Sequence, residues 1–264
     1  MQKKETEKFY DSELLEGMSS ISALIKAMER RSASNNRKIL KILIDENKKK
    51  SKSREIGFLK AKSTQLDFAI DFVSSDIIAE KTVGQTHGGI IAECTSRDIP
   101  MLNEGSLNKN GIYYFLEGVE DPYNFGYAVR SLYASGADGL ILSPRNWMGA
   151  AGIVARSSAG ASELIDLYIS EPTEAINTFK KLGYTVICAG IRDSVSIFDS
   201  NLKKPLFVIL GGEKRGISGT VLDMADNIVR IDYGTEFGGS LSTAAAAAVF
   251  GFEILRQNRD LKFK

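Results

Sequence analysis

Side chains that could carry out chemistry gather in three loops of the second half of the chain. In the first loop, Asn124 follows an Asp-Pro turn and Arg130 comes six residues later, on the helix expected to begin there. A neutral amide and a guanidinium can together hold a ribose and its adjacent phosphate, because arginine offers a fork of donors to phosphate oxygens. The alternative is an ordinary turn and helix start that carries a solvated arginine.

The second loop, residues 211–216, reads Gly-Gly-Glu-Lys-Arg-Gly and follows an apolar run that ends at Leu210. Glycines at the end of a strand let a ligand approach the backbone. The loop lacks Walker A spacing, and no Gly-x-Gly-x-x-Gly follows a strand, so triphosphate and dinucleotide sites are disfavoured. Glu213 is either a surface acid paired with Lys214 or Arg215, or a carboxylate that fixes a loop or a ligand.

The third loop, residues 232–239, leads into Ser240, Leu241 and Ser242 and then into five alanines, 244–248. Ser240 is the expected N-cap of a long helix, and the alanines allow that helix to pack closely. A helix start at the end of a strand also presents free N–H groups and hydroxyls to a ligand.

The elements that position these loops alternate between strands and helices. Strands are expected over 112–116, 139–142, 185–189, 206–210 and 228–231, and helices over 125–135, 174–182 and 240–257. This alternation predicts an α/β fold with a mainly parallel sheet covered on both faces. Ligands of such sheets bind at the carboxyl ends of the strands, which places the three loops and the turn after Ala189 at one edge.

The first part of the chain predicts a separate small α/β domain. An amphipathic helix is expected over 14–28 and a second helix over 54–62, with strands over 39–44, 68–73 and 89–94. Residues 97–111 contain proline, glycine, asparagine and serine without a sustained apolar period, as is typical of a linker. We therefore predict an N-terminal domain over 1–98, a linker over 99–111 and a C-terminal domain over 112–264.

Charge is nearly balanced over the whole chain, with 34 basic and 33 acidic side chains, and so indicates no partner. One window differs, because residues 30–62 hold twelve Lys or Arg and three acids. This basic window is either a solvated lysine-rich surface or a contact for a phosphate backbone, and the sequence leaves both open.

Several classes of protein are disfavoured by composition. Two cysteines, Cys94 and Cys188, and the single His87 are too few for an ordinary zinc site, so no metal is expected. No apolar run approaches the length of a membrane span, and residues 1–10 are charged rather than signal-like. We expect a soluble, cytoplasmic protein.

Taken together and in this order, the three loops resemble the three motifs of the SpoU, or TrmH-like, RNA ribose 2′-O-methyltransferases of the SPOUT superfamily. The resemblance covers residues 112 to about 257. Asn124 and Arg130 match the first motif, residues 210–216 the second and residues 240–246 the third. Residues 156–163 look like the Ser-x-Gly-Ala stretch that lies between motifs.

The resemblance implies S-adenosylmethionine as cofactor, a C-terminal trefoil knot, and a homodimer whose subunits share each active site. It also implies an N-terminal domain similar to ribosomal protein L30e that binds RNA, since residues 85–90 look like the family's His-Gln-Gly segment with Gly88 in place of the usual Gln. His87 is either an RNA contact or a satisfied turn histidine. A separate domain of this kind favours ribosomal RNA over transfer RNA as the substrate.

The resemblance also implies roles for single residues. Asn124 would orient the ribose, Glu213 would anchor its loop, and Ser240 with Ser242 would shape the site. Arg130 would position the 2′-hydroxyl or the neighbouring phosphate rather than act as a base, because a guanidinium holds its proton far above neutral pH. No metal is needed, since the methyl of a sulfonium is already electrophilic and has mainly to be aligned. The cofactor would lie against Ala189, Gly190, Leu210, Gly211, Gly212, Ile231 and Leu241.

Two departures from the family pattern lie beside the expected cofactor. Ser242 stands where the family usually has Asn, and residues 231–233 read Ile-Asp-Tyr in place of Ile-Pro-Met. Serine keeps a hydroxyl but is shorter than an amide, and Asp232 brings a charge to a wall that is normally apolar. Two alternatives to a ribose 2′-O-methyltransferase stay open. In one, the departures mark a lost cofactor pocket and the chain is an inactive dimeric RNA-binding or assembly factor that uses the basic window. The other is a methyltransferase that acts on a base nitrogen, as other branches of the SPOUT superfamily do.

Overall fold

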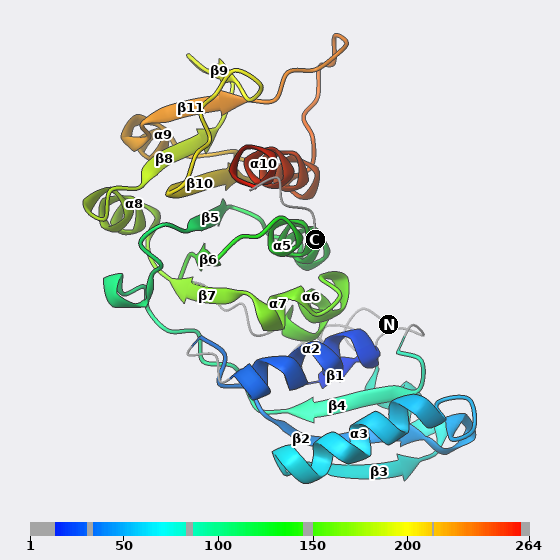
Figure 1. The fold of residues 1–264 in the computed structure, drawn as a ribbon. Helices are drawn as coiled ribbons and strands as arrows, with labels where there is room; N and C mark the ends of the chain where they lie inside the picture. The colour runs from blue at the N-terminus through cyan, green and yellow to red at the C-terminus, as the bar shows by residue number, and fades with distance from the viewer. Residues whose placement is uncertain (1–13, 31–33, 83–86, 145–149, 213, 260–264) are drawn as a thin grey trace. The chain divides into compact units, whose positions relative to one another are not determined.

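The chain forms two compact units, each with its own sheet. The computed structural model describes residues 14–30, 34–82, 87–144, 150–212 and 214–259. One unit, here called the N-terminal unit, comprises Met1–Asp98 and Asn146–Leu164, and the C-terminal unit comprises Ile99–Arg145 and Ile165–Lys264 (Figure 1). No helix in the described residues is long and apolar enough to cross a membrane.

The N-terminal unit is a four-stranded sheet with helices packed on it. Its strand order is β1-β4-β2-β3, in which β2 and β3 are parallel and β4 runs antiparallel to β1 and β2. The strands are β1 (Leu14–Glu16), β2 (Ile39–Asp45), β3 (Ala69–Val73) and β4 (Ile90–Cys94), and the helices before residue 98 are α2 (Gly17–Arg30), α3 (Ser53–Leu66) and α4 (Ser75–Lys81). A buried apolar cluster between sheet and helices holds this unit together.

The beginning of the first helix differs from the prediction. The apolar pattern from residue 14 predicts a helix, but residues 14–16 form β1, with the buried Leu15 opposite Ala92 of β4. The helix begins at Gly17, whose φ of 80° lies in a region that glycine adopts without strain. A strand of three residues is too short for periodicity to reveal.

A segment from the second half of the chain completes the N-terminal unit. Helices α6 (Ala151–Ser157) and α7 (Ala161–Leu164) group with it, a grouping that the predicted division at 99–111 does not include. Two glycines make their close packing possible. A Cβ on Gly152 would lie 2.6 Å from the Leu14 carbonyl oxygen, and one on Gly160 would lie 2.8 Å from that of Ser19.

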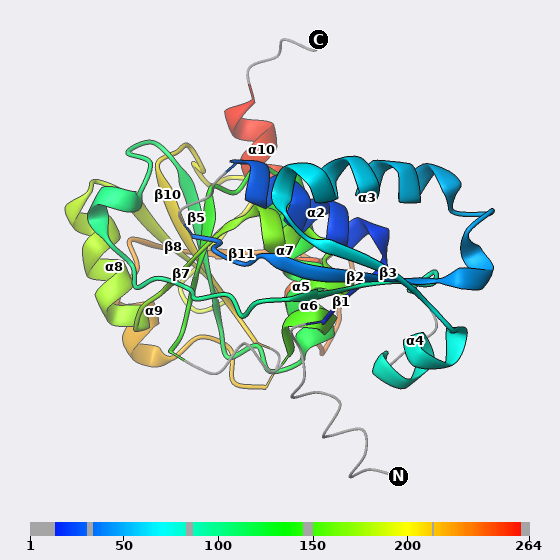
Figure 2. The ribbon, with the colours of Figure 1, turned by 90° about the horizontal axis from the view of Figure 1, so that it is seen from below.

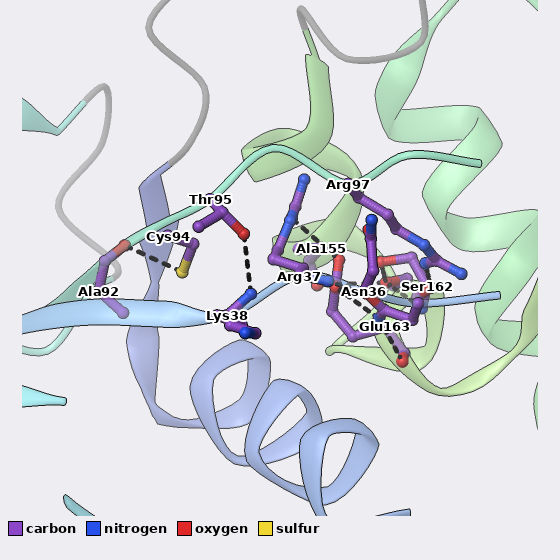
Figure 3. A network of polar contacts seen from close by, with 12 residues as sticks. Asn36, Arg37, Lys38, Ala92, Cys94, Thr95, Arg97, Ala155, Ser162 and Glu163 are labelled. Carbon is purple, nitrogen blue, oxygen red and sulfur yellow. Dashed lines mark hydrogen bonds and ion pairs between the residues drawn. The ribbon is translucent and has the colours of Figure 1, made fainter. Parts of the chain in front are cut away.

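A buried polar network fixes this segment (Figure 3). Arg37 Nη1 lies 3.2 Å from Glu163 Oε1, with side chains only 1% and 4% exposed. Asn35 donates to the other Glu163 oxygen at 3.1 Å, and Arg97 donates to the Ser162 carbonyl at 2.7 Å. A buried charge without its partner lowers the free energy of unfolding by several kcal/mol, so the buried Arg37 depends on Glu163 for the stability of this unit.

The C-terminal unit is a seven-stranded sheet of parallel neighbours in the order β7-β6-β5-β10-β8-β11-β9, shown from a second direction in Figure 2. The strands are β5 (Ile112–Glu117), β6 (Gly139–Leu142), β7 (Asp166–Ile169), β8 (Thr185–Ala189), β9 (Val195–Ser196), β10 (Leu206–Gly211) and β11 (Asn227–Arg230). All but the last residue of β5 and of β10 are buried, as is expected for central strands covered on both faces.

Four helices cover the two faces of this sheet. They are α5 (Pro122–Ala134), α8 (Pro172–Lys181), α9 (Gly219–Met224) and α10 (Thr243–Asn258). Helices α8 and α9 lie on one side, over the cluster that contains Phe179 and Phe207, whereas α5 and α10 lie on the other (Figure 1). The predicted fold class, a mainly parallel α/β sheet with a small N-terminal α/β domain, is confirmed.

The long last helix starts later than predicted. Its N-cap is Ser242, whose Oγ accepts a hydrogen bond from the Ala245 N–H at 3.2 Å, so the prediction of Ser240 as the cap is wrong. Leu241 is held outside the helix because its N–H donates to the Tyr233 hydroxyl at 3.1 Å. Patterning also missed the short elements β7, β9 and α9, which span only two to six residues.

Candidate active site

A cavity of about 630 Å³ lies at the carboxyl ends of β8, β10 and β11 in the C-terminal unit. This volume falls within the range of pockets that hold small ligands. All seven residues predicted to hold the cofactor line it: Ala189, Gly190, Leu210, Gly211, Gly212, Ile231 and Leu241. Their role stays a prediction, but the structure brings all of them to one place.

The wall after β10 is built from closely packed backbone. A Cβ on Gly211 would lie 2.6 Å from the Gly216 carbonyl carbon, and one on Gly212 would lie 2.4 Å from the Gly118 carbonyl oxygen. The Gly212 N–H donates to the Glu117 carbonyl at 2.6 Å. The second loop is thus folded tightly against the first, and no side chain fits at these two glycines without a backbone shift.

The three predicted loops meet at the first turn of α10. The Ala244 N–H donates to Asn124 Oδ1 at 3.3 Å, and the Thr243 hydroxyl donates to the Gly211 carbonyl at 2.8 Å. Asn124 is itself held in the first turn of α5, where Asp121 accepts from its N–H at 2.9 Å. Asn124 therefore joins α5 to α10, and Thr243 joins α10 to the loop after β10.

The structure separates the remaining predicted catalytic residues. Ser240 lines the cavity, whereas Ser242 caps α10 and is not a lining residue. Arg130 is exposed on α5 and does not line the cavity either. Within the described residues, no hydrogen bond ties its guanidinium to the protein. Glu213 lies outside the described residues.

The charge that Asp232 brings to the cavity is paired. Its Oδ1 accepts from Arg230 Nε at 2.7 Å, and Arg230 Nη1 also donates to the Ser194 carbonyl at 2.5 Å. Hydrogen bonding from Ser196, together with Arg230, holds the pKa of the Asp232 carboxyl below its usual range. Asp232 is therefore ionised near neutral pH and links the end of β11 to the region around β9.

An apolar rim, missed by sequence reasoning, surrounds the mouth of the cavity. Ile191 is 88% exposed, and the rings of Tyr233 and Phe237 lie 5.8 Å apart between centroids. Apolar and aromatic surface suits a flat heterocycle, while the backbone groups of the glycine wall suit its polar edge. The residues of this cavity thus fit S-adenosylmethionine, whose adenine combines both characters.

The two cysteines lie apart from this chemistry. Cys94 and Cys188 are buried free thiols in different units, and burial raises the pKa of Cys188 to about 12. In the part of the chain that the structure describes, no group of three or more His, Cys, Asp or Glu is placed to hold a metal ion.

Comparison with known proteins identifies relatives of both halves of the chain. The model of the SpoU rRNA Methylase family matches residues 111–252, and that of the RNA 2′-O ribose methyltransferase substrate binding domain matches residues 14–100. The 23S rRNA (guanosine-2′-O-)-methyltransferase RlmB of Shewanella oneidensis is 26% identical over 72% of this chain and 79% of its own length. A putative TrmH family tRNA/rRNA methyltransferase of Bacillus subtilis, YacO, is 25% identical over 84% and 90%.

Solved structures share the fold. The AdoMet-bound rRNA methyltransferase from Sinorhizobium meliloti has a TM-score of 0.76 at 18% identity, covering 98% of this chain and 97% of that one. The SpoU methyltransferase AviRb from Streptomyces viridochromogenes, also with AdoMet, has a TM-score of 0.73 at 19% identity, covering 93% and 91%. With the matched domains spanning both halves, the chain belongs to the SpoU rRNA methylase family and is an S-adenosylmethionine-dependent RNA ribose 2′-O-methyltransferase.

Proposed function

We propose that the chain methylates a ribose 2′-hydroxyl of ribosomal RNA, with S-adenosylmethionine in the cavity beside β8, β10 and β11. The observation that carries this proposal is the meeting of the three motif loops at the first turn of α10, next to that cavity. Ribosomal rather than transfer RNA is favoured by relatives named 23S rRNA methyltransferases.

The chain's own residues would act by positioning. When bound, S-adenosylmethionine supplies a methyl group on an electrophilic sulfonium. Arg130 would hold the ribose or its phosphate through its forked donors and would not accept the proton, since its guanidinium stays charged. Asn124 would set the position of the α10 start relative to α5, through the bond from the Ala244 N–H. Glu213 stays the predicted anchor of its loop.

We also propose a homodimer formed through α5 and α10. Within one chain these two helices pack closely, as Gly251 of α10 shows. A Cβ there would lie 2.3 Å from the Ser135 hydroxyl oxygen at the end of α5. Tyr123, Tyr127 and Arg130 follow one another at helical spacing along the exposed side of α5, and Tyr127 is 50% exposed. Exposed aromatic side chains of this kind mark interaction surfaces. A second copy that covers Tyr127 would meet Arg130 as well, which supports an active site shared between subunits.

The domain roles follow the predicted division. Residues 1–98 would bind the RNA substrate, 99–111 would link, and 112–264 would transfer the methyl group, except for the segment 150–164, which groups with the N-terminal unit. The cytoplasmic location and the C-terminal trefoil knot stay predictions.

The first experiment is calorimetric titration of S-adenosylmethionine into the purified protein. We expect saturable binding at about one site per subunit with micromolar affinity. Tritiated methyl transfer to ribosomal RNA should follow, and nuclease digestion with mass analysis should find the methyl group on a ribose. Methyl on a base nitrogen would instead support the base-modifying alternative. No heat of binding together with salt-sensitive RNA binding would support the inactive RNA-binding factor.

A further inference from the structure

A second cavity, of about 270 Å³, lies within the N-terminal unit. One wall is the start of α2, and another is the helical segment 150–164, from which Arg156 and Ala159 contribute. Lys52 lines it from the residue before α3, and His87 and Gly88 line it from the turn before β4. This cavity is far smaller than the one in the C-terminal unit and is built from side chains rather than from glycine backbone.

The donors of the lining suit an anion. Lys52 and Arg156 are its cations, and Glu16 is the one acidic side chain among the lining residues, which all belong to the described chain. Glu16 is paired with Arg156 at 2.8 Å, and Lys52 is paired with Glu55, outside the lining, at 2.9 Å. With His87 neutral, the charges of the lining residues sum to +1, and the Glu55 carboxylate beside Lys52 offsets that charge, so the cavity offers donors to a ligand rather than a net positive field. The first turn of α2 adds N–H groups without intrahelical acceptors and contains no acidic residue.

His87, which also lines the cavity, carries a donor on a defined ring nitrogen. The Gly89 N–H donates to its Nδ1 at 3.0 Å, so in the neutral ring the proton resides on Nε2. The His87 ring therefore combines an aromatic face with an N–H donor. Met18 and the buried Ile90 provide apolar surface beside it.

The wall that carries Arg156 is fixed in place. Its segment is held by the buried Arg37–Glu163 pair and by the close approach of Gly160 to α2. The Arg156 side chain is 21% exposed and the Glu16 side chain 10%. A guanidinium set in this way loses little conformational entropy when it binds a ligand.

We propose that this cavity binds one unpaired nucleotide of the RNA substrate, with its phosphate toward Lys52 and the start of α2 and its base against His87. A phosphate alone would use only the charged part of the lining, and an RNA duplex could not enter a space of 270 Å³. Proteins recognise single-stranded RNA by accepting splayed bases onto aromatic and polar side chains in this way. The inference rests on the proposed RNA substrate. It also makes Arg156 part of the wall that holds the nucleotide, although Arg156 lies outside the matched substrate-binding domain of residues 14–100.

The test uses a matched pair of charge reversals on the full, untagged chain. Lys52→Glu changes the cavity, and Lys60→Glu makes the same change at an exposed position of α3 that does not line it. We expect Lys52→Glu to weaken binding of a short fluorescein-labelled single-stranded RNA about tenfold and Lys60→Glu to weaken it less than about twofold. The same strand annealed to its complement should compete poorly with the single strand. Equal losses in the two variants would mean that only the general basic field matters and would overturn the proposal.

Nuclear magnetic resonance gives a second readout, since His87 is the only histidine in the chain. Its two carbon-bound ring protons, Hε1 and Hδ2, should shift saturably with guanosine 5′-monophosphate and with the RNA strand, and less with inorganic phosphate. A signal that does not move at saturating RNA would overturn the proposal. The wider function is tested separately: if Lys52→Glu methylates ribosomal RNA with unchanged KM, the pocket fails while the methyltransferase stands. If the unaltered chain did not bind S-adenosylmethionine, the proposed methyltransferase function would fail instead.

Discussion

The two units differ in the chemical groups that line their cavities. In the C-terminal unit the wall after β10 is glycine backbone at the end of a parallel strand, and the ion pair between Arg230 and Asp232 lies at the edge of the cavity. In the N-terminal unit the lining is mainly side chains, namely the cations Lys52 and Arg156, the acid Glu16 and His87, together with the start of α2. A backbone wall suits a neutral heterocycle at a fixed distance, whereas charged side chains suit a phosphate of the RNA chain. These linings match the two proposals, with the cofactor in the C-terminal unit and an RNA nucleotide in the N-terminal unit.

Glu163→Gln should give the largest difference in stability between the two units. This change leaves Arg37 buried without a countercharge, and we expect a loss of about 3–5 kcal/mol in the free energy of unfolding. Urea denaturation measures the loss, and hydrogen exchange should locate it in α6, α7 and their neighbours rather than in β5 and β10.

The matched control for that change is Glu104→Gln. Its ion pair with Lys181, at 2.7 Å, has side chains that are 44% and 69% exposed, so the expected loss is below about 1 kcal/mol. Equal losses for the two substitutions would show that burial of the Arg37–Glu163 pair does not matter.

Arg130→Ala should separate chemistry from cofactor binding. We expect methyl transfer to fall about a hundredfold, because a positioning group is lost, while affinity for S-adenosylmethionine stays within about twofold, because Arg130 does not line the cavity. Single-turnover transfer and calorimetry measure the two effects. Lys181→Ala, an exposed cation of α8 paired with Glu104, is the control and should leave both quantities unchanged. Unchanged transfer in Arg130→Ala would contradict the proposed role.

Gly212→Ala should damage the backbone wall directly. The added Cβ would lie 2.4 Å from the Gly118 carbonyl oxygen, which forces a backbone shift of the kind that costs about 1–3 kcal/mol. We expect affinity for S-adenosylmethionine to fall about thirtyfold, with binding of single-stranded RNA unchanged. Gly234→Ala adds a Cβ with no atom within 4 Å and should be silent. Retained cofactor affinity in Gly212→Ala would mean that the wall is not a binding surface.

The sequence predicts more of the C-terminal unit than of the N-terminal unit, and the reason is physical. Parallel strands such as β8 and β10 carry mostly apolar runs, so their ends are visible in the sequence pattern, and the resemblance to the family then names the seven lining residues at those ends. Residues 150–164 pack with the N-terminal unit, and no periodic pattern in the sequence predicts this grouping. It depends on contacts more than a hundred residues apart, such as Asn35 with Glu163. Gly152 and Gly160 were visible, but nothing in their spacing names the surfaces they approach.

The capping of α10 shows the same limit at short range. Both Ser240 and Ser242 have the side chain that a cap requires, and propensity cannot choose between them. The choice is made by the Tyr233 hydroxyl, which accepts from the Leu241 N–H and keeps that residue outside the helix. Tyr233 stood out in the sequence only as a departure from the family motif.

The smallest effect should come from Asp232→Asn, which tests whether the charge at the edge of the C-terminal cavity is structural. The change keeps the shape but weakens the link to Arg230 and Ser196, so we expect S-adenosylmethionine affinity to fall about threefold at neutral pH. The folded-state pKa of Asp232 lies below its usual value, so the carboxylate favours the folded arrangement above that usual value and loses this contribution as the pH falls through the depressed pKa. Cofactor affinity of the unaltered chain should therefore decline on acidification toward that pKa, while Asp232→Asn should lack this component. If Asp232→Asn showed the same acid decline as the unaltered chain, another group would govern it, and the pairing with Arg230 would have no part in shaping the cavity.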